Sequence, residues 1–231
     1  MNKLNIKTIA TRAVLLIIAI FLAIQVWIFA SLLWWKYRPV ETTMFMRWSY
    51  YSDTSQPIRH KWVDLNDMSP YIVQAILASE DTGFDQHNGF EWASMQRALQ
   101  ANEQAGDVVR GGSTISQQLA KNLFLTNHRS YLRKGQEAIA TVMMESLWSK
   151  QRILEVYLNS VEFGNHLFGV EEAAQRYFGH SAKQLTKEQA AFLAAILPQP
   201  RYFENDPNHS RVKARRRVIL ERMSQMRMPQ N

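Results

Sequence analysis

The sequence contains no cysteine among its 231 residues. This absence excludes a disulfide, a thiolate nucleophile and any metal site with cysteine ligands. It is compatible with an oxidising compartment, where unpaired thiols are uncommon. No internal repeat or low-complexity tract is visible either, and the length suits one substantial domain.

Long apolar runs are also absent, with one exception at residues 13–33, which is interrupted only by Gln25 and Ser31. A run of this length can cross a bilayer as a helix. Three aromatic residues between Trp34 and Tyr37 follow it and resemble an interfacial belt. A cleaved signal peptide is the alternative, but the run is too long and no small-x-small cleavage site follows.

Charged residues flank both ends of this run, so their count favours a cytoplasmic N-terminus only weakly. We expect a cytoplasmic segment over residues 1–12 and a transmembrane helix over residues 13–33. Poor periodicity then indicates a juxtamembrane linker over residues 34–60. The folded domain should occupy residues 61–231, all on one side of the membrane.

The formal net charge is +7, and basic residues concentrate on a predicted helix from Ser210 to Met226. This balance suits an anionic partner such as phospholipid, a phosphorylated substrate or nucleic acid. The basic helix lacks a nearby cluster of stacking aromatic residues, and the chain has no nucleic-acid motif. A membrane-tethered binding protein remains an alternative to an enzyme.

A candidate general base lies at the end of a predicted helix. Ser69 is a good N-cap and Pro70 suits the first helical position. Ile72 and Ile76 mark the apolar stripe, which Glu80 continues at the C-terminal end. Apolar surroundings and the negative end of the helix dipole both disfavour a charged carboxylate there. Glu80 is therefore a candidate base, although a solvated helix-ending pair of acids fits the same residues.

Two glycines and Ser113 as N-cap introduce a second helix, whose first backbone N–H groups favour an anion. Ser113, Gln117 and Lys121 recur every four residues and should share one polar face. A polar row that ends in lysine suits a diphosphate, although an ordinary solvated face has the same pattern.

A third helix is predicted from about His128 to Trp148. Arg133 and Glu137 can pair on one face, and Arg129 extends that face toward the N-terminus. Such a ladder is usually worth less than about 1 kcal/mol and can be purely structural. Gly135 costs the helix about 1 kcal/mol relative to alanine, and the sequence offers no reason for it.

Four segments, in order, resemble the signatures of the family 51 peptidoglycan glycosyltransferases. They are Glu80-Asp81-x-x-Phe84-x-x-His87-x-Gly89, Gly111 to Asn122, Arg133-Lys134-x-x-Glu137, and Lys150-x-x-Ile153-Leu154-Glu155-x-Tyr157-Leu158-Asn159. The chain looks like the monofunctional biosynthetic form. The resemblance implies a mainly α, lysozyme-like, two-lobed glycosyltransferase domain behind a single N-terminal transmembrane helix. In the fourth segment, we interpret Glu155 and Asn159 as structural.

The resemblance also implies an activity, the polymerisation of lipid II into β-1,4-linked glycan strands with inversion and release of undecaprenyl diphosphate. Glu80 would remove the proton from the 4-hydroxyl of the acceptor. Lys121 and Arg129 would hold the diphosphate of the donor. Glu137 would be a second acidic residue, which assists the leaving group or keeps the neighbouring cations in place. The substrate-binding residues implied in addition are Arg97, Ser113, Gln117, Gln118, Arg133 and Lys134.

A divalent ion such as Mg²⁺ can bridge the diphosphate in this family, but no metal-ligand cluster in the sequence demands one, and no organic cofactor is expected. The implied partners are lipid II, the growing strand, membrane lipid, and proteins of cell-wall synthesis or division, but not nucleic acid. The implied location is the bacterial inner membrane, with the catalytic domain on the periplasmic side.

Two further enzyme classes compete with this interpretation. A lysozyme-like hydrolase or lytic transglycosylase also uses a glutamate on a helical fold, but it would need no cations directed at a diphosphate. A transpeptidase is not indicated, because Ser210-x-x-Lys213 lies on a basic helix and no Lys-Thr-Gly triplet follows.

Overall fold

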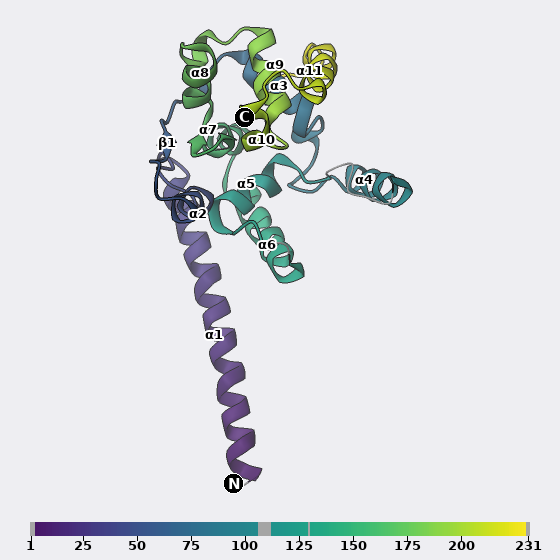
Figure 1. The fold of residues 1–231 in the computed structure, drawn as a ribbon. Coiled ribbons are helices and arrows are strands. Elements are labelled where there is room, and N and C mark those ends of the chain that lie inside the picture. Colours follow the sequence, from purple (N-terminus) through teal and green to yellow (C-terminus); the bar gives the residue numbers. More distant parts are fainter. Residues whose placement is uncertain (1–2, 106–111, 129, 230–231) are drawn as a thin grey trace.

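The computed structural model describes residues 3–105, 112–128 and 130–229, which are mostly helical (Figure 1). This confirms the predicted mainly α fold. Short 3₁₀ turns and three short strands connect the helices. The helices are α1 (Lys3–Trp35), α2 (Met44–Ser52), α3 (Pro70–Glu80), α4 (Trp92–Ala105), α5 (Ile115–Phe124), α6 (Tyr131–Leu147), α7 (Lys150–Ser160), α8 (Val170–Phe178), α9 (Lys187–Ile196), α10 (Pro200–Asn205) and α11 (Ser210–Met223).

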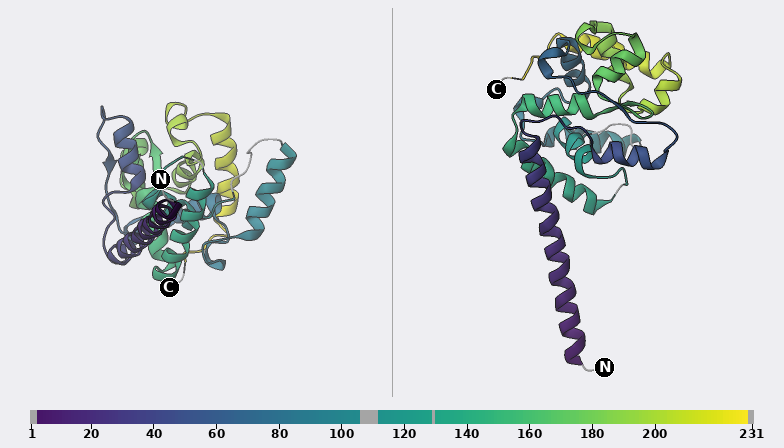
Figure 2. Two further views of the ribbon diagram at one scale, coloured as in Figure 1. Left: turned by 90° about the horizontal axis from the view of Figure 1, so that it is seen from below. Right: turned by 90° about the vertical axis from the view of Figure 1, so that its left-hand side faces the viewer.

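The apolar run predicted as a membrane anchor lies within α1. Its segment Lys7–Trp35 is long and apolar enough to cross a membrane by length and composition. Most of α1 projects from the folded domain (Figures 1 and 2), and Leu15 and Leu16 are exposed. Nearer the domain, Ile28 and Leu32 are buried in the same apolar cluster as the domain helices. The outer end of α1 is therefore part of the core.

Polar contacts also fix α1 to the domain. Gln25 exchanges hydrogen bonds of 2.9 and 3.0 Å with Gln136 of α6, which lies beside α1. The guanidinium of Arg152 donates to the backbone oxygen of Trp35 at 2.7 and 3.1 Å. These contacts hold the anchor in one orientation relative to α6 and α7.

The segment that we expected to be a linker contains α2. Its N-cap is Thr43, whose hydroxyl accepts a 3.1 Å hydrogen bond from the backbone N–H of Met46. The helix has nine residues and buries only Met46 and Ser49, so its sequence carries little apolar periodicity. A short helix with one buried turn is difficult to recognise from such a pattern.

The domain helices form two groups. α3, α9 and α11 pack together at one end, and α5 packs against α6 and α7 at the other (Figures 1 and 2). One buried apolar cluster joins the groups and includes Ile76, Leu119, Leu154 and Leu193. The arrangement agrees with the two-lobed domain expected from the sequence.

A small sheet lies against this body, with strands in the order β1 (Arg59–His60), β3 (Leu167–Phe168) and β2 (Glu162–Gly164). β1 is parallel to β3, and β2 is antiparallel to it. The chain after β1 is held by α7. Asn159 bonds both backbone groups of Val63, at 2.9 and 2.8 Å, and Glu155 accepts from the N–H of Leu65 at 2.9 Å. The structural interpretation of Glu155 and Asn159 is confirmed.

Candidate active site

Glu80 is the last residue of α3, as the sequence predicts. Its side chain is 15% exposed. Ser79 Oγ donates to its Oε1 at 2.9 Å, and Gln118 Nε2 donates to its Oε2 at 3.0 Å. Arg215 Nη2 lies 3.6 Å from Oε1. The carboxylate is thus oriented from three helices and still reaches solvent.

The expectation of apolar surroundings for this carboxylate is wrong. Ile72 and Ile76 are fully buried on the apolar stripe. The helix ends at Glu80, however, and there the side chain meets polar groups of α5 and α11.

A buried tyrosine orients the amide beside Glu80. Tyr157 of α7 is fully buried, and its hydroxyl donates to Gln118 Oε1 at 3.0 Å. Burial, and then the negative charges of Glu80 and Asp81, raise the pKa of Tyr157 well above its ordinary value. The hydroxyl therefore stays protonated and donates a hydrogen bond to the amide oxygen. This turns the NH₂ group of Gln118 toward Glu80.

Asp81 joins the loop after α3 to the start of α5. Its buried carboxylate lies 2.9 and 3.0 Å from His87 Nε2 and accepts from the backbone N–H of Ile115 at 3.0 Å. Gly89 N donates to His87 Nδ1 at 3.1 Å, so the ring proton belongs on Nε2. Gly89 O in turn accepts from Thr114 Oγ1 at 2.7 Å. The loop therefore fixes the helix that carries Gln118.

Lys150 of α7 also contacts the loop after α3. Its Nζ donates to the backbone oxygen of His87 at 2.6 Å and lies 4.6 Å from the centre of the Phe84 ring. It also pairs with Glu145 at 2.8 Å, and the hydroxyl of Ser116 bonds the same carboxylate. Residues of the first, second and fourth segments thus form one connected network.

The third segment forms a compact cluster of charges on α6. Glu137 is buried, with its side chain 3% exposed. Arg133 Nη1 lies 2.6 Å from Glu137 Oε2, and Lys134 Nζ bonds Oε1. The predicted pairing of Arg133 with Glu137 is confirmed. Both oxygens of Glu137 are occupied by cations, so in this arrangement the carboxylate holds the two basic side chains in place.

Comparisons with known proteins identify the family of the chain. A family described as Transglycosylase matches residues 49–224. A protein of Acinetobacter baumannii named biosynthetic peptidoglycan transglycosylase is 56% identical over 224 residues, covering 97% of this chain and 100% of the relative. Proteins of the same name in Acinetobacter baylyi and an Azoarcus species are 56% and 52% identical, covering 96% and 84% of this chain and 100% and 85% of theirs. The chain belongs to the transglycosylase family.

The structure of this transglycosylase corrects the predicted polar row on α5. Thr114, and not Ser113, is the N-cap, because Thr114 Oγ1 accepts from Gln117 N at 3.2 Å. Gln117 Oε1 accepts from Thr114 N at 3.0 Å in return. This capping box turns Gln117 inward, and only 1% of the residue is exposed. The structure therefore gives Gln117 a role in the helix cap, and its contact with a substrate stays a prediction.

The other predicted substrate-binding residues of the transglycosylase occupy separate places. Ser113 is exposed, and its backbone oxygen lies 3.5 Å from Gln118 Nε2. Lys121 is half-buried, with Nζ 5.2 Å from the centre of the Phe45 ring of α2. Arg97 lies on α4, which projects from the domain (Figure 1), and its guanidinium is 3.3 Å from Glu91 Oε1. Arg129 falls outside the described residues.

Two residues beside Glu80 were missed by sequence reasoning. Arg215 belongs to the basic run of α11, which reads as a solvated or anion-binding face. Tyr157 reads as one more apolar position of α7. The fourth segment does contain Tyr157, so its place there was a usable signal. No spacing in the sequence connects Arg215 with Glu80, because the packing of α11 against α3 brings them together.

The described residues do not form a metal site of their own. Among the residues that the structure describes, no group of three histidine, aspartate or glutamate side chains could hold a metal ion. The carboxylates beside the site already bond Gln118, Arg133, Lys134 or His87. A divalent ion at this site would therefore depend on oxygens of the substrate.

Proposed function

We propose that this peptidoglycan glycosyltransferase polymerises lipid II and that Glu80 is its general base. The observation that carries the proposal is the orientation of one accessible carboxylate by Gln118, Ser79 and Arg215. A general base must be held within hydrogen-bond reach of the proton it removes. The partly exposed end of α3 offers such a position.

In the proposed reaction, Glu80 takes the proton of the 4-hydroxyl on the terminal GlcNAc of lipid II, the acceptor. The hydroxyl oxygen attacks C1 of the terminal MurNAc of the growing strand, the donor. The bond from C1 to the diphosphate oxygen breaks as the new bond forms on the opposite face. The products are a β-1,4 linkage, undecaprenyl diphosphate and a protonated Glu80, which then returns its proton to solvent.

The leaving group is a diphosphate, which needs cations more than it needs a proton donor. We assign its binding to Lys121 and Arg129. Glu137 then acts through Arg133 and Lys134, whose positions it fixes. The two ion pairs of the buried Glu137 support this role for Glu137. A divalent ion such as Mg²⁺ would bind chiefly to the diphosphate itself, and no step is assigned to it.

The proposed location is the bacterial inner membrane, with the domain on the periplasmic side. An apolar α1 whose outer end packs into the domain supports it, because this holds the site close to the membrane surface. A lipid-linked diphosphate lies at that height. Proteins of cell-wall synthesis or division would be the partners of such an enzyme.

The test is incubation of the purified full chain with lipid II in detergent. We expect glycan polymer together with undecaprenyl diphosphate, at one released diphosphate for each new linkage. A muramidase specific for β-1,4 linkages should degrade the polymer. A lytic enzyme would instead release short sugars from preformed glycan and make no polymer from lipid II, and that result would overturn the proposal.

A further inference from the structure

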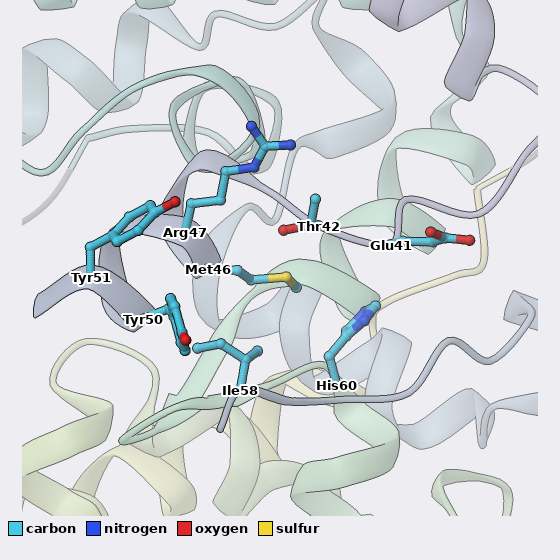
Figure 3. A pocket seen from close by; sticks show the side chains of 8 residues that line it. All are labelled: Glu41, Thr42, Met46, Arg47, Tyr50, Tyr51, Ile58 and His60. Carbon is cyan, nitrogen blue, oxygen red and sulfur yellow. The ribbon is translucent and has the colours of Figure 1, made fainter. Parts of the chain in front are cut away.

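A pocket opens beside α2, in the part of the chain that directly follows the anchor helix (Figure 3). Its cavity volume is about 360 Å³. Met46 and Ile58 supply apolar lining, and Thr42 lies between the charged side chains of Arg47 and Glu41 in this view. None of these residues belongs to the four segments that form the site around Glu80.

The two charged residues of the pocket have opposite signs. Arg47 and Glu41 are both exposed, and neither forms an ion pair with another residue in the described part of the chain. Burial lowers the pKa of His60, which also lines the pocket, so its ring is neutral near pH 7. The charge of Glu41 is therefore not cancelled by this neighbour. A ligand that carries both an anion and a cation would complement Arg47 and Glu41 together.

The position of α2 indicates that the source of this ligand is the membrane surface. α2 lies at the same level as the outer end of α1 along the axis of that helix (Figures 1 and 2), and its Trp48 and Tyr51 are 55% and 75% exposed. Tyr37, just past the end of α1, is 83% exposed. Exposed tryptophan and tyrosine next to the end of a membrane-spanning helix are typical of the lipid headgroup region. The pocket therefore lies at the level of phospholipid headgroups.

We propose that this pocket binds the headgroup of a zwitterionic phospholipid with a primary ammonium group, of the phosphatidylethanolamine type. Arg47 pairs with the phosphate, since guanidinium groups form strong charge-assisted hydrogen bonds with phosphate oxygens. Glu41 accepts hydrogen bonds from the ammonium group. The apolar side chains of Met46 and Ile58 pack against the carbon atoms between them. The site goes beyond glycosyl transfer and does not depend on the role of Glu80.

The experiment uses the full chain in nanodiscs that contain equal amounts of phosphatidylethanolamine and phosphatidylcholine with the same acyl chains. The lipids retained by the protein are counted by native mass spectrometry. We expect phosphatidylethanolamine to exceed phosphatidylcholine at least fivefold. Mono- and dimethylated phosphatidylethanolamine should be retained progressively less, because each methyl group removes an N–H donor to Glu41.

Variants connect the preference with the pocket. Glu41→Gln and Arg47→Gln should each reduce the ratio of retained phosphatidylethanolamine to phosphatidylcholine toward one. Both residues are exposed, so these substitutions should disturb the fold little. Lys36→Gln is the control, because Lys36 carries the same charge near the end of α1 but lies over the Tyr37 ring, outside the pocket. Equal retention of the two lipids, or a preference unchanged in both pocket variants, would overturn the proposal. A stronger preference for phosphatidylglycerol in a three-lipid nanodisc would indicate a simple anion site and would also overturn it.

Discussion

Arg215 of α11 reaches across to Glu80 of α3, with Nη2 3.6 Å from Oε1. The same nitrogen donates to Ser79 Oγ at 3.1 Å, and this hydroxyl donates to the same carboxylate oxygen at 2.9 Å. Arg215 therefore acts on Glu80 both directly and through Ser79. The orientation of the proposed base depends on how α11 packs against α3.

The first prediction concerns this contact. Arg215→Gln removes a cation that orients the Glu80 carboxylate, so we expect the polymerisation rate to fall about tenfold. That loss corresponds to about 1.4 kcal/mol, which is near the value of one hydrogen bond to a charged group. Arg217→Gln is the matched control, since Arg217 is exposed on the same helix. Equal losses in both variants would mean that only the overall charge of α11 matters.

The second prediction concerns the base itself. Glu80→Gln keeps the size of the side chain and an oxygen for Ser79 or Gln118, but it removes basicity. We expect a loss of at least about a hundredfold in polymerisation of lipid II, as is usual for a general base. The thermal midpoint should change little. Glu221→Gln, an exposed position of α11, serves as the control and should keep full activity. Near-normal turnover by Glu80→Gln would exclude this mechanism.

Local structure was predictable where short-range rules decide it. Ser69 caps the helix that it was expected to begin, and Glu80 ends α3 as the apolar spacing indicates. The prediction of Ser113 as the N-cap of α5 is wrong, because two adjacent hydroxyl residues satisfy the same capping rule. The reciprocal capping box with Gln117 identifies Thr114 as the cap, and it also explains why Gln117 is buried.

Long-range packing was not predictable from spacing. The contact of Arg215 with Glu80 joins helices from opposite ends of the domain sequence, and nothing local requires it. The same applies to α1, in which Ile28 and Leu32 read as ordinary lipid-facing positions of an apolar run. Burial of such residues depends on which helix lies beside them, and only the fold shows that.

The third prediction separates binding of the diphosphate from structural ion pairing. Lys121→Ala should lower turnover strongly and the thermal midpoint little, because one partly exposed cation rarely determines a fold. Glu137→Gln should lower both, since it leaves Arg133 and Lys134 without their buried partner. The expected loss of unfolding free energy is roughly 2 kcal/mol, below the cost for a fully buried pair because both cations reach solvent.

A double variant extends the comparison. If Lys121 and Arg129 bind the same diphosphate, Lys121→Ala combined with Arg129→Ala should cost less than the sum of the two single losses. The measurements are the thermal midpoint and the polymerisation rate of each variant. A midpoint that falls in step with activity in Lys121→Ala would assign this lysine to the fold and not to the substrate.

The fourth prediction concerns the outer end of α1. Leu32 is fully buried, and its backbone oxygen accepts a 2.8 Å hydrogen bond from Trp148 Nε1. Leu32→Ala should destabilise the domain by about 2–5 kcal/mol, the usual range for a buried leucine. Leu33→Ala provides the control, because Leu33 is 47% exposed on the next position of the helix. Thermal unfolding in detergent should distinguish them, and equal midpoints would show that α1 does not contribute to the core.

The fifth prediction compares two glycines. Gly135 lies within α6, and a Cβ atom built there would have no neighbouring atom within 4 Å. Gly135→Ala should therefore stabilise the protein by about 0.4–1 kcal/mol, because alanine favours a helix and restricts the unfolded chain. Activity should not change, since the new methyl group contacts nothing.

Gly89 gives the opposite expectation. Its φ of +88° favours glycine, and an added Cβ would lie 2.6 Å from Thr141 Cγ2. Gly89→Ala must shift the loop after α3. The backbone oxygen of residue 89 accepts a hydrogen bond from the hydroxyl of Thr114, and Thr114 caps the helix that carries Gln118. Polymerisation should fall together with the thermal midpoint. If Gly89→Ala kept both, the loop after α3 would not be what holds Gln118 against Glu80, and the base would owe its orientation to α11 and Tyr157 alone.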